Sequence, residues 1–348
     1  YQLFYCHWCA LTIPTDVFWG PEAALSFITR QQHVGQDHWL DDAWADGGLL
    51  MDTSRHILLL FSREDFEVIP QRRLYMALLQ EVWVGWDVRW AHGGQLEIGK
   101  YVGLPTDWEI SSPSPGLISD TYDTADVIAS IIFEDSRLAF FPLDLEIEGY
   151  LQSGLALIKS ARQSTGLAVL PLNEWTDDFP SAGFHIDVPD KRLLFWANFS
   201  LHNFEWAGWQ IEWLKDRYEG QLAETRGMLT LQTFTDELLA QVETALLRDT
   251  SPAGPRLIRE ITEKVGDAKV SASALQSAPQ SLSEVDKRRI LDAAIAAAAR
   301  GEVVDAAVVH AEDEARLLAR GLTPGQLIAI RTEVFAEMEG AYGIPLCG

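Results

Sequence analysis

The chain has 348 residues, 47% of them hydrophobic, and a formal net charge of −24 at pH 7. That length suits roughly two or three domains with a substantial core. With only 27 basic residues, we expect no direct binding to a nucleic-acid backbone, because such affinity comes from Lys and Arg neutralising phosphates. No apolar run reaches the length that crosses a bilayer, so we expect no membrane partner.

Helix and strand signals alternate through the first hundred residues. The apolar residues 1–13 predict a first strand rather than a signal peptide, because no basic region or cleavage site accompanies them. Residues 21–32 predict a helix that begins with Pro21. Residues 48–61 predict two short strands around a polar turn at 52–55. A second helix is expected over residues 70–80.

One tryptophan motif occurs twice. Residues 83–90 and 206–213 both read Trp-x-Gly-Trp-x-aliphatic-x-Trp, and Gly-Gln-Leu follows each copy, at 94–96 and 220–222. A second similarity precedes each copy of the motif. Gly48 and Gly183 each begin a run that reaches an Asp four residues later. Self-similarity of this kind predicts an internal duplication. The tryptophans of the motif could stack sugars or nucleobases from an exposed face. Because the motif occurs once in each half, we expect them instead to pack in the core.

The first copy of the motif has two competing periods. Trp86, Val88 and Trp90 alternate as in a half-buried strand, whereas Trp83, Trp86 and Trp90 have the spacing of a helix face. Gly85 weakens the helix, so we expect a hairpin whose second strand carries Leu96 and Ile98. The second copy lacks a nearby glycine turn, and its strand could continue into a helix.

The second half follows a Ser- and Pro-rich linker at residues 111–116. The expected elements are a hairpin over 127–141 with its turn at 134–137, a helix near 146–163, a strand at 167–170, and a hairpin with its turn at 188–191.

The residue pattern of the chain changes after about residue 226. One helical face there carries Leu231, Phe234, Leu238 and Val242. A flexible linker is expected over 267–282. Three further helices follow, and Ser283 begins the first of them. We expect these helices to be separable from the rest and to support self-association through their alanine-rich faces.

The predicted fold class is therefore α+β. Two duplicated units with antiparallel hairpins and flanking helices are followed by an all-helical C-terminal region. The expected domains are a first unit at 1–110, a second unit at 118–225, a helical extension at 226–266, and a helical bundle at 283–346.

The three cysteines give little sign of a ligand site. Cys6 and Cys9 have the gap of a zinc half-site, but the remaining ligands would have to come from His33, His38 or Cys347, which lack characteristic spacing. We expect free structural thiols, no bound metal and no cofactor. An odd number of cysteines without a disulfide framework makes a reducing cytoplasm the expected compartment.

Two weak clusters of polar residues are candidate sites. His38, Asp41 and Asp42 lie in a segment rich in acid and Trp residues, where oxygen ligands could hold a divalent cation and His38 could act as a general base. The structural alternative is a solvated loop that its tryptophans anchor. His185 and Asp187 share one face of an expected strand. Because Asp52 matches Asp187, we favour a turn-opening role for that aspartate.

No established catalytic or nucleotide-binding motif occurs in the chain. We expect an intracellular acidic protein that binds or assembles other proteins without catalysis. Its net charge is explained by solubility alone, and the sharper interpretations are a basic protein partner or mimicry of a polyanion. The alternative is a hydrolase or metal-dependent enzyme with a site between the two repeated units, built from His38, Asp41 and Asp42 or from His185 and Asp187.

Overall fold

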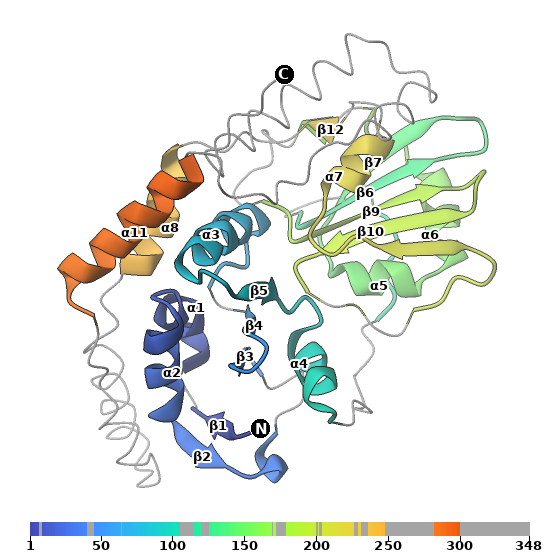
Figure 1. Ribbon diagram of the computed structural model, residues 1–348. Coiled ribbons are helices and arrows are strands. Elements are labelled where there is room, and N and C mark those ends of the chain that lie inside the picture. The colour runs from blue at the N-terminus through green and yellow to red at the C-terminus, as the bar shows by residue number, and fades with distance from the viewer. Residues whose placement is uncertain are drawn as a thin grey trace, which may run out of the picture.

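The computed structural model mixes helices with β-sheets (Figure 1). It describes residues 1–6, 9–39, 45–63, 65–104, 114–119, 125–168, 170–171, 179–199, 201, 204–225, 229–230, 236–247 and 282–299. We call residues 1–104 the N-terminal segment and residues 114–225 the middle segment.

The N-terminal segment contains strands, two short 3-10 helices and α-helices in the order β1 (Leu3–Tyr5), η1 (Cys9–Leu11), α1 (Ile13–Val17), α2 (Pro21–Thr29), β2 (Gln32–Val34), η2 (Gln36–His38), β3 (Gly47–Asp52), β4 (Ile57–Ser62), α3 (Ile69–Val82), β5 (Asp87–Trp90) and α4 (Gly94–Val102). The elements that follow are β6 (Val127–Ile132), β7 (Leu138–Leu143), α5 (Ile147–Gln152), α6 (Leu155–Gln163), β8 (Leu170–Pro171), β9 (Ala182–Asp187), β10 (Arg192–Ala197), β11 (Gln210–Trp213), α7 (Glu219–Glu224), β12 (Leu229–Thr230), α8 (Asp236–Leu247) and α11 (Glu284–Ala299).

Two sheets organise the molecule. The N-terminal segment forms a three-stranded sheet in the order β3-β4-β5, and the middle segment forms a five-stranded sheet in the order β11-β10-β9-β6-β7. Hairpins β3–β4, β6–β7 and β9–β10 are antiparallel, as the sequence predicts. The tryptophan strands β5 and β11 pair in parallel with β4 and β10. Two-stranded pairs β1-β2 and β12-β8 complete the pairing among the described residues.

Two expected elements are different in the structure. The predicted strand at Leu96 and Ile98 is wrong, because these residues lie in helix α4. Gln95, Leu96, Ile98 and Gly99 are its buried residues, which is the spacing of a helix face. The helix expected near 146–163 is divided into α5 and α6 at Gly154, whose φ of 56° interrupts the helical backbone. In the second tryptophan motif, β11 is indeed followed by helix α7.

The five-stranded sheet has apolar side chains on both faces, because alternate residues of a strand point to opposite sides. One face packs against α5 and α6 and includes Phe141, Phe184 and Phe195. The other face carries Leu194 and Trp196, which belong to a core shared with the N-terminal segment and α7. This shared core joins the two sheets.

Helix α11 packs alongside α3 and α8 (Figure 1). Ser283 precedes it as the sequence predicts, and its Oγ accepts a hydrogen bond from the backbone N–H of Asp286 at 3.1 Å. Leu291, Ala294 and Ala298 are buried in the shared core. The helices expected beyond residue 301, and the extension between 248 and 266, lie outside the described residues. The separability of residues 283–348 therefore stays a prediction.

Candidate functional site

Three exposed leucines lie in the segments that connect to Gly116, α5 and α6. Leu117, Leu145 and Leu155 expose 54%, 51% and 61% of their surface, and we call them the leucine patch. Gly116 precedes Leu117 and lies close to Leu145, since a Cβ added at Gly116 would stand 3.4 Å from Leu145 Cδ1. The carbonyl of Gly116 accepts a hydrogen bond from Ser153 Oγ at 2.5 Å, two residues before Leu155.

Carboxylates border the leucine patch. Asp144 and Glu146 flank Leu145, and both are exposed. The Tyr150 hydroxyl donates to Asp144 Oδ1 at 3.1 Å and accepts the backbone N–H of Leu145 at 3.3 Å. Burial raises the pKa of Tyr150 to about 12, so the hydroxyl keeps the proton that it donates. Tyr150 therefore fixes the backbone that presents both a leucine and a carboxylate to solvent.

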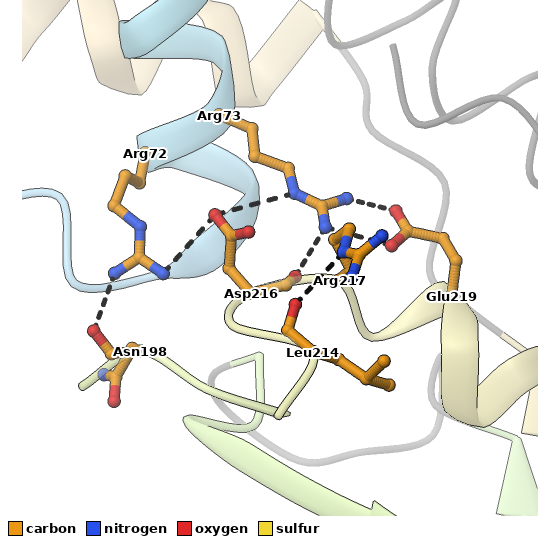
Figure 2. Close-up of polar contacts among 7 residues, drawn as sticks. All are labelled: Arg72, Arg73, Asn198, Leu214, Asp216, Arg217 and Glu219. Atoms are coloured by element: carbon orange, nitrogen blue, oxygen red, sulfur yellow. Dashed lines mark hydrogen bonds and ion pairs between the residues drawn. The ribbon is translucent and has the colours of Figure 1, made fainter. Parts of the chain in front are cut away.

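A second polar cluster lies where the N-terminal and middle segments meet. Figure 2 shows Arg72 and Arg73 of α3 reaching toward the chain that follows β11. Arg73 forms an ion pair with Glu219 and donates to the carbonyl of Asp216 at 2.5 Å. Arg72 is buried, donates to the carbonyl of Asn198 at 3.1 Å, and stands 3.7 Å from Asp216 Oδ2. These contacts cross from one segment to the other.

Burial and charge act against each other in this junction. Burial raises the pKa of Asp216, but the positive charges of Arg73 and Arg72, joined at low pH by protonated His92, outweigh it and hold that pKa below its usual value. Burial lowers the pKa of His92 to about 4, and the attraction of Asp216 only partly offsets this effect. His92 is therefore neutral at pH 7, edge-on to the Trp213 ring at a centroid distance of 6.5 Å.

A third polar cluster is buried between α7 and the five-stranded sheet. Gln221 accepts the indole N–H of Trp196 at 2.7 Å. Its amide nitrogen lies within hydrogen-bond distance of the carbonyls of Ile128 and Phe184 and of Ser130 Oγ. One glutamine thus links three adjacent strands, β6, β9 and β10. Each polar group inside the core needs a hydrogen-bond partner, and Gln221 is the partner of several such groups at once.

The structure separates the residues that the sequence marks as candidate sites. His185 and Asp187 are both buried on β9, and His185 Nδ1 is 2.9 Å from Ser130 Oγ. Asp187 Oδ1 accepts the backbone N–H of Asp190 at 3.0 Å, which closes the hairpin turn. His38 is exposed on η2, 3.4 Å from Asp37. β2, which precedes η2, lies well apart from β9 in Figure 1. Asp41 and Asp42 lie outside the described residues.

The prediction of free thiols is wrong for two of the cysteines. Cys6 and Cys9 form a disulfide, with their Cα atoms 5.4 Å apart. The expected strand through these residues would point them to opposite faces, but the strand ends at Tyr5 and η1 begins at Cys9. The two cysteines therefore do not lie on opposite faces of one strand. The bridge removes the argument for a reducing compartment that rested on cysteine usage.

Neither a metal centre nor a membrane span is found in the described part of the chain. Among those residues, no group of three or more His, Cys, Asp or Glu side chains is arranged to hold a metal ion. Within the same residues, no helix combines the length and the apolar character needed to cross a membrane.

Sequence reasoning missed the residues that make the densest polar contacts. Arg72 carries a detectable signal, because it falls between Ile69 and Tyr75 on the buried face of α3, where a charge requires a partner. Gln221 belongs to the doubled Gly-Gln-Leu motif, but the motif itself does not indicate which groups it would bond. Ser130 and Asp216 carry no local signal, since their partners come from distant parts of the chain.

Comparisons of the chain with protein-family models, with curated proteins and with solved structures found no match.

Proposed function

We propose that this protein is an acidic protein-binding or assembly protein without catalysis of its own, built from two related α+β units, and that it binds a basic partner. The observation that carries the proposal is the leucine patch with its carboxylate border. Large exposed apolar groups that gather in one place, with polar groups around them, are typical of surfaces that bind other proteins.

The charge of the chain supports a basic partner. A net charge of −24 creates a negative potential that attracts cationic surfaces and accelerates their association. Asp144 and Glu146 place part of that charge beside Leu145. A partner segment that combines apolar side chains with Lys or Arg would satisfy both features of the patch.

The hairpins support the relation between the two units. In β3–β4, Gly47 pairs with Ser62 and Asp52 with Ile57, while in β9–β10 Ala182 pairs with Ala197 and Asp187 with Arg192. All four strands have six residues. The last turn residues, His56 and Lys191, have φ of 53° and 51°. Non-glycine residues rarely adopt this conformation, so its repetition at the same place is informative.

The strands and helices around the hairpins support the same relation. β5 pairs in parallel with β4 from Ile57 to Leu60, and β11 pairs in parallel with β10 from Arg192 to Phe195. A Cβ at Gly48 would approach Phe61 and Gln95, while one at Gly183 would approach Trp196 and Gln221. Gln95 and Gln221 are the glutamines of the two Gly-Gln-Leu copies. A common ancestral unit explains these repeated details most simply.

The alternative of an enzyme with a site between the units has less support. Of its candidates, His185 is completely buried in the sheet and Asp187 closes a turn. The junction between the segments is instead occupied by the paired charges of Arg72, Arg73, Asp216 and Glu219. These groups neutralise one another, an arrangement more typical of a structural contact than of a reaction site.

Capture from an extract of the native host tests the proposal. The full chain is immobilised, and bound proteins are eluted by rising salt and identified by mass spectrometry. We expect one basic protein in stoichiometric amount, released as salt rises, because screening weakens attraction between exposed charges. The proposal fails if no protein is retained stoichiometrically, or if the retained protein is acidic and salt does not release it.

A further inference from the structure

Strands β3 and β9 differ at one edge. β9 lies between β10 and β6, whereas β3 pairs with β4 and has no second strand among the described residues. Their exposure differs accordingly, since all six residues of β9 are buried and all six residues of β3 are of intermediate exposure. β4 and β10, the inner partners, have the same burial pattern. The difference is therefore confined to the edge that β6 covers in the middle segment.

The backbone of β3 presents hydrogen-bonding groups along that edge. Asp46 accepts the backbone N–H of Arg63 at 2.8 Å, which fixes the alternation of the antiparallel ladder. Leu50 therefore bonds to β4, while the N–H and C=O groups of Leu49 and Met51 point away from it. An edge of this kind is a template for pairing with another strand.

The middle segment shows what such an edge accommodates. β6 runs parallel to β9, with Ile131 opposite Ile186 and Ile132 opposite Asp187. Its sequence, Val-Ile-Ala-Ser-Ile-Ile, is apolar except for one serine, and all of its residues are buried. Gln221 of α7 donates to the carbonyl of Ile128 and so helps to hold β6 in place.

We propose that the edge of β3 that no described strand covers accepts a strand from a different protein, which runs parallel to β3 and is apolar on both faces. This inference rests on the proposed relation between the two units. Asp52 and Met51 of β3 correspond to Asp187 and Ile186 of β9. The incoming strand therefore pairs with β3 in the register that β6 has with β9. Both faces of β3 are packed at its first two residues, because a Cβ added at Gly47 would meet Ala10 and Ile13 and one added at Gly48 would meet Gln95 and Ile98. This packing favours an added strand that is apolar on both faces. Partners that add a strand in this way gain affinity from main-chain hydrogen bonds.

A peptide derived from β6 tests the inference. The probe contains residues 126–133 with two lysines added at each end for solubility, and a scrambled peptide of the same composition is the control. Amide hydrogen exchange of the full chain is measured by NMR. We expect the Leu49 and Met51 amides to exchange at least about tenfold more slowly with the probe. The Leu50 amide, already bonded to β4, should not change, and the scrambled peptide should have no effect.

Two substitutions at one position provide a second measurement. Met51→Pro removes an N–H that points away from β4, whereas Met51→Ala keeps it. We expect the proline variant to lose probe binding and the alanine variant to retain it. If the proline variant does not fold, hydrogen exchange in the unmodified chain decides alone.

Several outcomes would overturn the inference. The Leu49 and Met51 amides could already be protected in the free protein, which would mean that the chain covers its own edge. Protection that rises with protein concentration without the probe would indicate a second copy as the occupant. Equal protection by the scrambled peptide would exclude a specific register. The double variant Leu117→Ser/Leu155→Ser should bind the probe normally, so failure at β3 and failure of the leucine patch are distinguishable.

Discussion

Trp83 and Trp206 stand in the same relation to their surroundings. The indole N–H of Trp83 donates to the carbonyl of Val17 at the end of α1, and that of Trp206 donates to the carbonyl of Leu151 in α5. Each ring also meets a second tryptophan edge-on, Trp86 or Trp209, at a centroid distance of 5.0 Å. Each tryptophan thus connects its motif to a short helix that precedes it by more than fifty residues.

Matched substitutions at these two positions test the relation between the units. Trp83→Phe and Trp206→Phe both remove an indole donor, leave a buried carbonyl unpaired and open a cavity. We expect each variant to lose on the order of 2 kcal/mol of unfolding free energy. Urea denaturation monitored by circular dichroism measures both losses. A large loss at one position with none at the other would contradict the proposed equivalence.

The junction between the segments depends on Arg73. Arg73→Met leaves the carboxylates of Glu219 and Asp216 near each other without their main cation. Removing one partner of a buried pair costs about 3–5 kcal/mol, which we expect as the loss of unfolding free energy. The matched control is Arg89→Met, whose ion pair with Asp87 is exposed and should contribute less than about 1 kcal/mol. Equal losses of unfolding free energy in the two variants would show that the ion pairs of Arg73 stabilise the fold no more than the exposed pair of Arg89.

His92 makes the stability of the fold dependent on pH. Its pKa falls from 6.5 to about 4 on folding, so between these values the unfolded chain binds a proton that the folded chain does not. Stability therefore decreases as pH falls from 6.5 toward 4, by at most about 1.4 kcal/mol per pH unit from this group. Urea denaturation at a series of pH values should show a shallower slope for His92→Asn than for the unmodified chain.

The packing of α11 makes it possible to test whether residues 283–348 are separable from the rest of the chain. A chain of residues 1–282 lacks Leu291, Ala294 and Ala298, which are buried in the shared core, and should lose about 3 kcal/mol of unfolding free energy from the apolar area that becomes exposed. A chain of residues 1–299 keeps α11 and is the reference against which this loss is measured. If the two shortened chains unfold at the same urea concentration, α11 is separable as the sequence predicts.

The sequence predicts local elements better than pairings between them. The turns of β3–β4 and β9–β10 follow from polar residues between apolar runs, and Asp52 accepts the backbone N–H groups of Ser54 and Arg55 as a turn aspartate does. The partner of β5 is not predictable in this way. β5 pairs with β4 across the intervening helix α3, whereas the alternation of Leu96 and Ile98 suggests a local hairpin.

The same limit applies to the polar groups. Gln221 bonds to Ser130, ninety-one positions earlier in the chain, and Arg73 to Glu219, 146 positions later. Only the tertiary fold brings these residues together, so their types and local spacing carry no sign of the contact. The leucine patch is likewise assembled from separate segments, since Leu117, Leu145 and Leu155 come from three elements or loops. An exposed leucine cannot be distinguished from a core leucine by sequence alone.

The affinity of the partner captured from the host extract shows whether the leucine patch binds it. Isothermal titration compares the unmodified chain with Leu117→Ser/Leu155→Ser, and with Val84→Ser, whose side chain is 83% exposed in the N-terminal segment. The double variant should bind at least about tenfold more weakly, a loss of about 1.4 kcal/mol or more, because apolar anchors dominate binding energy. Val84→Ser should bind with unchanged affinity. An unchanged dissociation constant for the double variant would contradict the account.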